Sequence, residues 1–289
     1  MKKHMAMAIA AAMLLALTGC GSSSSAASTT ATATTAATTA ATTTAATTTA
    51  ATTAASGGTV TLAAAASLKN AFEDKLIPMF EKETGIQVTA TYDSSGKLQT
   101  QIEEGADVDV FFSAAMKQMN TLTGESLVDS ASVVKLLENK LVMVVPAATA
   151  DGTYTSFQDV LKADTVAIGD PASVPAGQYA QEALTSLGLW DQLQSRTVSL
   201  GTNVTEVLQW VAAGSADVGF VYKTDAASKS TEVKVVAEAP EGSLASPVIY
   251  PVGITAKTTR KEAAQKLMTF LQSSEALAVF SEYGFTPNK

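Results

Sequence analysis

The chain has 289 residues, with 27 acidic and 19 basic side chains and a formal net charge of −8. Its one histidine, His4, and its one cysteine, Cys20, both lie near the N-terminus. Residues 57–289 therefore lack the groups for a Ser-His-Asp or Cys-His nucleophile, a zinc site of thiolate or imidazole ligands, or a histidine general base. They also contain no cluster of basic residues that could face nucleic acid, so no nucleic-acid partner is expected.

The first residues have the pattern of a secretory signal. A basic start, Lys2 to His4, is followed by an apolar run from Met5 to Leu17 that is too short for a permanent membrane-spanning helix. The run ends in Leu17-Thr18-Gly19-Cys20, which resembles the lipobox of bacterial lipoproteins, where the cysteine is acylated. We therefore predict a signal peptide over residues 1–19 and lipidation of Cys20, with a buried free thiol as the alternative.

A low-complexity segment follows. From Gly21 to Ser56 the chain consists almost wholly of Ser, Ala and Thr, with no charged or aromatic side chain to build a core. Residues 20–56 are predicted to be the lipidated cysteine and a disordered tether with a typical end-to-end distance of roughly 30 Å. The alternative is a helical alanine-rich stalk, which the many β-branched threonines disfavour.

In residues 57–289, short apolar β-rich runs alternate with helix-like segments. This alternation predicts an α/β fold with largely parallel sheets that are covered by helices on both faces. The eight runs are Val60–Ala64, Ile86–Tyr92, Val108–Phe112, Leu141–Val145, Val166–Gly169, Val218–Tyr222, Val233–Val236 and Val248–Ile254.

The helix starts can be recognised from their capping residues. Ser67 is predicted to cap a helix that Pro78 should kink or split, and Ser95 is predicted to cap a helix over residues 96–104 that Gly105 ends. Pro175 predicts a further helix start. The segment Asn203-Val204-Thr205-Glu206 has the spacing of a capping box, with Asn in place of Ser or Thr.

These helix starts can bind an anion without any charged side chain. A helix N-terminus carries unpaired N–H groups and the positive end of the helix dipole. Several such termini can converge outside the carboxyl ends of the strands of an α/β sheet. The pattern alone leaves two interpretations open: a shared anion site, or ordinary caps in an ordinary α/β protein.

Taken in order, the segments of residues 57–289 resemble the solute-binding protein of molybdate importers. The order and the similar spacings cover essentially the whole of this region. The segments are Val60 to Leu68, Tyr92-Asp93-Ser94-Ser95-Gly96, Gly169-Asp170-Pro171, Val174 to Ala180, Asn203-Val204, Gly219-Phe220-Val221-Tyr222, Tyr250-Pro251-Val252 and Tyr283-Gly284-Phe285.

The resemblance implies a type II periplasmic-binding-protein-like fold with two α/β lobes and two crossing hinge strands. The hinge strands are expected near Leu141–Val145 and Tyr250–Ile254, so that residues 57–143 and 251–289 form lobe I and residues 144–250 form lobe II. The expected function is capture of molybdate or tungstate and delivery to the permease and ATPase of an ABC importer. The protein would be a monomer at the extracytoplasmic face of the cell membrane, anchored through Cys20, and not an enzyme.

The resemblance also implies a set of oxyanion-binding groups. They are the hydroxyls of Ser67 and Ser95 with their local N–H groups, the N–H groups of Ala176 and Val204, and the phenol of Tyr222. Because these donors are neutral, neither a cofactor nor a metal-cation site is expected. Asp93 and Lys97 depart from a neutral neighbourhood around Ser95, and an inward-pointing Asp93 would repel an anion.

Two short motifs in the sequence match other classes of protein in part. Ser94-Ser95-Gly96-Lys97 has the Ser-x-x-Lys spacing of penicillin-binding proteins, but the companion Ser-Asp-Asn and Lys-Thr-Gly motifs are missing. Gly96-Lys97 lacks the other residues of a phosphate-binding loop. A related binding protein for sulfate or phosphate, one for ferric iron, and a lipoprotein adhesin remain as alternatives.

Overall fold

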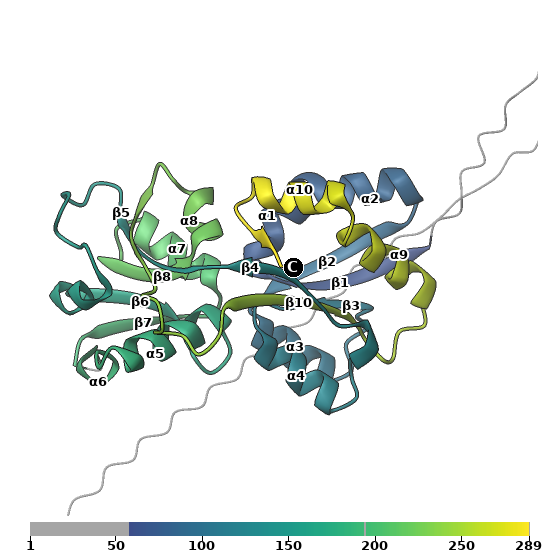
Figure 1. Ribbon diagram of the computed structural model, residues 1–289, viewed down its shortest axis with the longest axis horizontal. Coiled ribbons are helices and arrows are strands. Elements are labelled where there is room, and N and C mark those ends of the chain that lie inside the picture. The colour runs from purple at the N-terminus through teal and green to yellow at the C-terminus, as the bar shows by residue number, and fades with distance from the viewer. Residues whose placement is uncertain (1–57, 194, 289) are drawn as a thin grey trace, which may run out of the picture. The chain divides into compact units, whose positions relative to one another are not determined.

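The computed structural model of the chain describes residues 58–193 and 195–288, in which two β-sheets are flanked by helices (Figure 1). The two-sheet α/β fold predicted from the sequence is confirmed. The predicted signal peptide, the lipid anchor at Cys20 and the tether lie outside the described residues. In the described part, no helix combines the length and the apolar character that crossing a membrane requires.

The first sheet has six strands and mixed directions. Strand β1 runs parallel to β2 and β3, whereas β10 is antiparallel to both of its neighbours, and β11 is antiparallel to β4. In order across the sheet, the strands are β11 (Thr286–Pro287), β4 (Val134–Asn139), β10 (Val248–Ile254), β3 (Val110–Phe112), β1 (Thr59–Ala65) and β2 (Gln87–Asp93).

The second sheet has five strands, and it is mixed as well. Strand β6 is parallel to β7 and β8, whereas β5 is antiparallel to β8 and β9. The expectation of largely parallel sheets is therefore wrong. In order across the sheet, the strands are β7 (Thr197–Gly201), β6 (Thr165–Gly169), β8 (Val218–Tyr222), β5 (Leu141–Pro146) and β9 (Val233–Glu238).

The chain crosses between the two sheets twice, and the crossings account for the antiparallel pairs. The first crossing passes from β4 through Lys140 into β5, and the second passes from β9 through residues 239–247 into β10 (Figure 1). Strands that enter by a crossing do not follow a β-helix-β unit, so nothing forces them to be parallel to their neighbours. Strands β5 and β10 begin at Leu141 and Val248, each three residues before the lobe boundaries predicted at residues 144 and 251.

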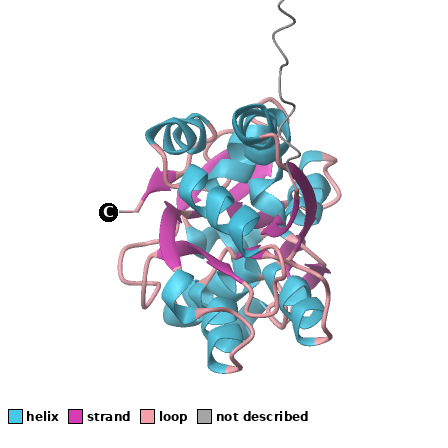
Figure 2. Cartoon of the chain, turned by 90° about the vertical axis from the view of Figure 1, so that its right-hand side faces the viewer, coloured by secondary structure: helices cyan, strands magenta, loops and turns pink. Residues whose placement is uncertain are grey.

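Helices cover both faces of the six-stranded sheet (Figure 2). The side chains of β1 alternate accordingly: Leu62 and Ala64 belong to one buried cluster and Ala63 to another, which the helices α3 and α4 complete. In both lobes together, the α-helices of the described residues are α1 (Lys69–Ala71), α2 (Ile77–Thr84), α3 (Ser95–Glu103), α4 (Met116–Gly124), α5 (Pro175–Ser186), α6 (Trp190–Leu193), α7 (Val204–Ala212), α8 (Lys223–Ser228), α9 (Lys261–Leu271) and α10 (Ser274–Glu282).

The predicted split of the helix at Pro78 is not seen; the helix changes type before this residue instead. A π-helical turn, Phe72–Leu76, separates α1 from α2, and Pro78 lies in the first turn of α2. The backbone keeps right-handed helical dihedral angles at Ala71, Leu76 and Ile77, so the chain stays helical through both junctions.

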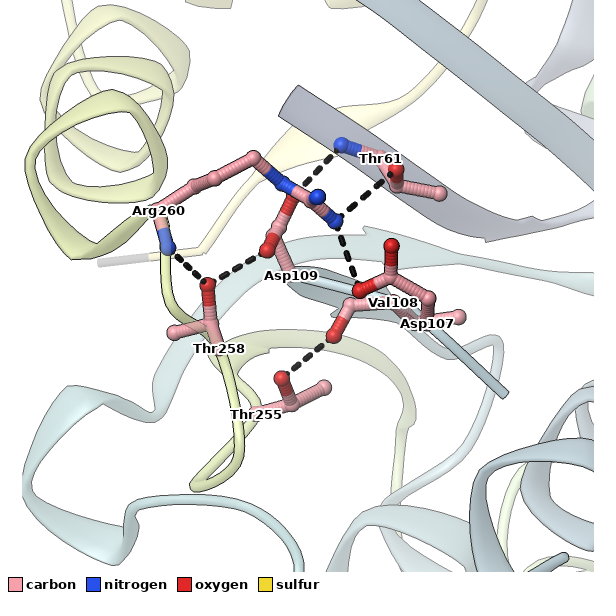
Figure 3. Close-up of polar contacts among 7 residues, drawn as sticks. All are labelled: Thr61, Asp107, Val108, Asp109, Thr255, Thr258 and Arg260. Carbon is pink, nitrogen blue, oxygen red and sulfur yellow. Dashed lines mark hydrogen bonds and ion pairs between the residues drawn. The ribbon is translucent and has the colours of Figure 1, made fainter. Parts of the chain in front are cut away.

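A buried ion pair lies where β1 and β3 begin, at the side of the first sheet away from the carboxyl ends of these strands (Figure 3). The carboxylate of Asp109 is fully buried and accepts hydrogen bonds from Arg260 Nε at 2.7 Å, from the N–H of Thr61 at 2.7 Å and from the hydroxyl of Thr258. Arg260 also pairs with the exposed Asp107 at 2.7 Å. These bonds connect the start of β1, the residue before β3 and the loop before α9.

We expect Arg260→Met to destabilise the fold by about 3 kcal/mol, because it leaves a buried carboxylate without its counter-ion. Urea denaturation of the soluble domain, residues 57–289 without the predicted anchor and tether, measures the loss. The matched control is Asp107→Asn, which removes the exposed partner of the same guanidinium and should cost under about 1 kcal/mol. Equal effects of the two substitutions would contradict a special role for the buried pair.

Candidate functional site

All five residues predicted to bind an anion line one small cavity between the two sheets. The cavity lies at the carboxyl ends of β1, β2 and β8, whose last residues, Ala65, Asp93 and Tyr222, are part of its wall. Its volume of about 10 Å³ is close to the least that admits one water molecule and far below the roughly 300 Å³ of a pocket for a drug-sized molecule, so the cavity is nearly closed. The predicted residues in its lining are Ser67, Ser95, Ala176, Val204 and Tyr222.

The hydroxyl of Ser95 is held by the backbone of the turn that follows β3. Ser95 is the first residue of α3 and is fully buried, and its Oγ accepts the N–H of Ala114 at 2.9 Å. Since a backbone donor occupies an acceptor position of Oγ, the hydroxyl proton is left to donate elsewhere. The prediction that Ser95 caps α3 is wrong: the cap is Ser94, whose hydroxyl accepts the N–H of Lys97 at 3.4 Å.

Ser67 occupies a different kind of position from the predicted helix cap. It lies inside a short 3₁₀ helix, Ala66–Leu68, and its side chain caps no helix. Its Oγ is 2.9 Å from the hydroxyl of Tyr250. The direct continuation of β1 into this turn brings the Ser67 hydroxyl to the carboxyl end of the sheet.

Two helix starts from the second sheet supply main-chain donors. Ala176 is the second residue of α5 and Val204 is the first residue of α7, so their N–H groups have no acceptor within the helix. The Asn203 side chain caps α7 by accepting the N–H of Glu206 at 3.1 Å, as predicted. The carboxylate of Glu206 accepts the N–H of Thr202 rather than that of Asn203, so the capping box is only half formed.

Glycines allow the start of α5 to reach the cavity wall. A Cβ atom on Gly177 would lie 1.9 Å from the carbonyl oxygen of Gly169, the last residue of β6. No side chain can be accommodated at that distance. The start of α5 is therefore fixed against the end of β6 by direct backbone contact.

Tyr222 presents the most informative group in the cavity. It is 1 % exposed, and among the described residues its hydroxyl has no hydrogen-bond partner. Burial raises the pKa of the phenol well above its usual value, so it keeps its proton and can only be neutral. A buried hydroxyl without a partner costs about 1–3 kcal/mol, which a ligand oxygen at this place would recover.

The carboxylate of Asp93 reaches the cavity wall but is already engaged. Its Oδ1 accepts the N–H of Ser94 at 2.7 Å and lies 3.4 Å from Nζ of Lys97. Lys97 thus offsets the negative charge beside Ser95. The two residues that depart from a neutral neighbourhood pair with each other.

The two lobes are hydrogen-bonded to each other beside the cavity. The N–H of Gly96, in α3, donates to the carbonyl oxygen of Ser173 at 2.9 Å, and Nε2 of Gln118 donates to Oε1 of Gln178 at 3.2 Å. Both bonds connect a residue of the first lobe to one of the second. The cavity is therefore closed on this side.

The wall of the cavity offers no site for a metal cation. Over residues 58–193 and 195–288, no three His, Cys, Asp or Glu side chains gather closely enough to hold a metal ion. The donors described above suit an anion instead.

Sequence reasoning missed two residues behind the cavity. Tyr250 was part of a segment that resembles the family but had no predicted role. Asn139 had none either, although its Nδ2 donates to the Tyr250 hydroxyl at 3.3 Å. Ser67 and Tyr250 are 183 residues apart in the chain, so no local pattern could have paired them.

Two α/β lobes joined by two crossings, with a small donor-lined cavity at the ends of their strands, define a two-lobed solute-binding protein. The sequence matches the profile of the bacterial extracellular solute-binding proteins over residues 60–286, and the chain belongs to this family. Members of the family bind solutes and are not enzymes, so the expectation of a non-enzymatic, extracytoplasmic protein is confirmed.

Similar proteins include importer components from several bacteria. YvgL of Bacillus subtilis, named as a substrate-binding lipoprotein of an ABC transporter, is 41 % identical over 79 % of this chain and 86 % of its own. The molybdate-binding protein ModA of Escherichia coli is 38 % identical over 79 % of this chain and 89 % of its own. The solved substrate-binding domain of a molybdenum ABC transporter from Clostridium difficile is 37 % identical, covers 81 % of this chain and 100 % of its own, and has a TM-score of 0.62.

Next to Tyr222 lies a buried carboxylate with an unusual pKa. Asp225, in the first turn of α8, is 6 % exposed and accepts the N–H of Tyr222 at 3.1 Å. Burial raises its pKa to about 7, and the single backbone hydrogen bond offsets only part of that effect. Because the folded state binds this proton more tightly than the unfolded state, stability falls as the pH rises through the range from about 4 to 7.

We expect Asp225→Asn to raise the free energy of unfolding at pH 8 by roughly 3 kcal/mol, because it removes the cost of a buried charge and keeps the acceptor for Tyr222. The gain should shrink as the pH is lowered toward 4, where the native carboxyl is protonated. Urea denaturation of both proteins across this range measures the difference. Parallel stability curves for the two proteins would contradict the raised pKa.

Proposed function

We propose that this protein captures molybdate or tungstate outside the cytoplasm and delivers it to the permease and ATPase of an ABC importer. The observation that carries the proposal is the buried Tyr222 hydroxyl, which has no partner in the described part of the chain and faces a cavity that helix N–H groups also line. The names of the similar proteins from Escherichia coli and Clostridium difficile support the choice of ligand.

The proposed binding groups are all hydrogen-bond donors. They are the hydroxyls of Ser67, Ser95 and Tyr222 and the N–H groups of Ala176 and Val204. A fully deprotonated tetrahedral dianion has only acceptors, so each of its oxygens can be satisfied by such a set. Charge-assisted hydrogen bonds of this kind are roughly twice as strong as neutral ones.

The same donors disfavour phosphate and sulfate for different reasons. Phosphate keeps at least one proton near neutral pH, and burying that O–H without an acceptor costs on the order of 1–3 kcal/mol, or roughly tenfold to a hundredfold in affinity. Of the nearby acceptor Asp93, the Oδ1 atom is engaged by Ser94 and Lys97. Sulfate carries no proton, but its shorter bonds would stretch hydrogen bonds set for the larger ion.

We expect tight binding of molybdate and tungstate, much weaker binding of sulfate and negligible binding of phosphate, as measured by calorimetry on the soluble domain. Ser67→Ala, Ser95→Ala and Tyr222→Phe should each weaken molybdate binding by roughly tenfold or more, because each removes a donor to a charged ligand. Ser186→Ala, an exposed serine at the end of α5, is the matched control and should bind as the wild type does.

Two outcomes of this calorimetry would contradict the proposal. Sulfate or phosphate binding as tightly as molybdate would show that the donor set does not select the ligand, and that Asp93 acts as an acceptor. Loss of binding in a chelator, restored by a divalent cation, would contradict the proposal that neither a metal cation nor a cofactor takes part.

Closure of the lobes depends on Gly96. A Cβ at this position would lie 2.3 Å from the carbonyl oxygen of Ser173 in the other lobe. We expect Gly96→Ala to hold the lobes apart and weaken molybdate binding at least tenfold, and small-angle scattering should show less compaction on addition of molybdate than in the wild type. Gly124→Ala, where a Cβ meets no atom within 4 Å, is the control. Full compaction of Gly96→Ala would rule out this contact as a condition for closure.

The membrane attachment is part of the same proposal. We propose that Cys20 carries the lipid anchor, because it ends an apolar run in the sequence Leu17-Thr18-Gly19-Cys20, and the similar protein YvgL is named a lipoprotein. The protein would act as a monomer that is tethered near its permease. Metabolic labelling with a fatty acid, lost in Cys20→Ser, tests the anchor.

A further inference from the structure

The side-chain amide of Asn139 has one possible orientation. Asn139 is the last residue of β4, directly before the first crossing, and it is 8 % exposed. Its Oδ1 accepts the N–H of Lys140 at 2.8 Å, and a main-chain N–H can only donate. The amide nitrogen must therefore point the other way, where it donates to Thr224 Oγ1 at 2.9 Å and to the Tyr250 hydroxyl at 3.3 Å.

This orientation places a donor on the Tyr250 oxygen. The phenol is fully buried, and burial raises its pKa well above the usual value, so it carries one proton. Its oxygen already accepts from Asn139, and the Ser67 Oγ lies 2.9 Å away. If Tyr250 donates to Ser67, the Ser67 oxygen is the acceptor and the Ser67 proton is left free for the cavity.

We propose that Asn139 and Tyr250 are positioning residues that fix Ser67 as a hydrogen-bond donor to the bound anion. The relay runs from the amide of Asn139 through the phenol of Tyr250 to the hydroxyl of Ser67, and each bond is polarised in the same direction. Neither Asn139 nor Tyr250 lines the cavity, so they act on the ligand only through Ser67. This inference rests on the proposed function, since it needs an anion that Ser67 contacts.

The relay contributes to selectivity as well as to affinity. A serine hydroxyl by itself can donate or accept, so it could adapt to a protonated oxyanion by turning its own proton away. With Tyr250 donating to it, Ser67 has one lone pair occupied and its proton free to donate to the ligand. A ligand with a proton on that oxygen would lose its partner.

The test is a double-mutant cycle on molybdate affinity, with calorimetry on the soluble domain. Tyr250→Phe removes the hydroxyl and keeps the ring, and Asn139→Leu removes the amide at nearly the same size. Each should weaken molybdate binding about fivefold in the wild-type background. In the Ser67→Ala background each should change it by less than about twofold, because the group through which they act is gone.

Thr224→Val serves as the matched control. It removes the other acceptor of the Asn139 amide without touching the relay, so molybdate affinity should stay within about twofold of the wild type. Thermal denaturation identifies a variant that fails to fold, and the remaining member of the pair Tyr250→Phe and Asn139→Leu then decides the question.

The outcomes separate the relay from the proposed function. Wild-type protein that binds no oxyanion overturns both. Wild-type protein that binds molybdate while Tyr250→Phe binds it equally well overturns the relay alone. A loss on Tyr250→Phe or Asn139→Leu that persists in Ser67→Ala, or that Thr224→Val reproduces, also overturns it, because the effect would then arise from the packing of the hinge.

Discussion

A phenol that is buried without a hydrogen-bond partner is a cost to the folded protein, and Tyr222, whose hydroxyl has no partner within residues 58–193 and 195–288, shows that cost at the point where the two lobes meet. Packing alone gives no reason to end a buried strand in a hydroxyl. The cost makes sense if an acceptor arrives from outside and if the lobes close over it. The other donors around the cavity lie after the end of β1 and at the starts of α3, α5 and α7. They too are available to one shared acceptor.

Such a site needs backbone atoms at distances that side chains would prevent. Gly177 lies against Gly169 within the second lobe, and Gly96 lies against Ser173 across the two lobes. The first contact fixes the start of α5 on the end of β6, and the second sets how near α3 can come to that start. Donors that the backbone holds in place can select an ion by its size better than mobile side chains can.

Much of the fold could be read from the sequence because buried strands are apolar runs, and the eight predicted runs correspond to β1, β2, β3, β5, β6, β8, β9 and β10. Strand β7 was missed because its short sequence, TVSLG, has no continuous apolar run, β4 because its sequence, VKLLEN, mixes charges with leucines, and β11 because it has only 2 residues. The site residues followed from the family resemblance. Their detailed roles did not, since the cap at Ser94 and the contact of Asn139 with Tyr250, 111 residues away, depend on tertiary geometry.

The order of the strands along the chain also determines which lobe can be completed first during synthesis. All five strands of the second sheet are contained in residues 141–238, so that lobe has its complete sheet as soon as β9 has been made. The first sheet begins at Thr59, but β10 lies in its middle, between β4 and β3, and is made only after β9. The lobe that begins first is thus the last that can be completed, and until Ile254 emerges from the ribosome β3 and β4 each have an open edge that a chaperone or a wrong strand can reach.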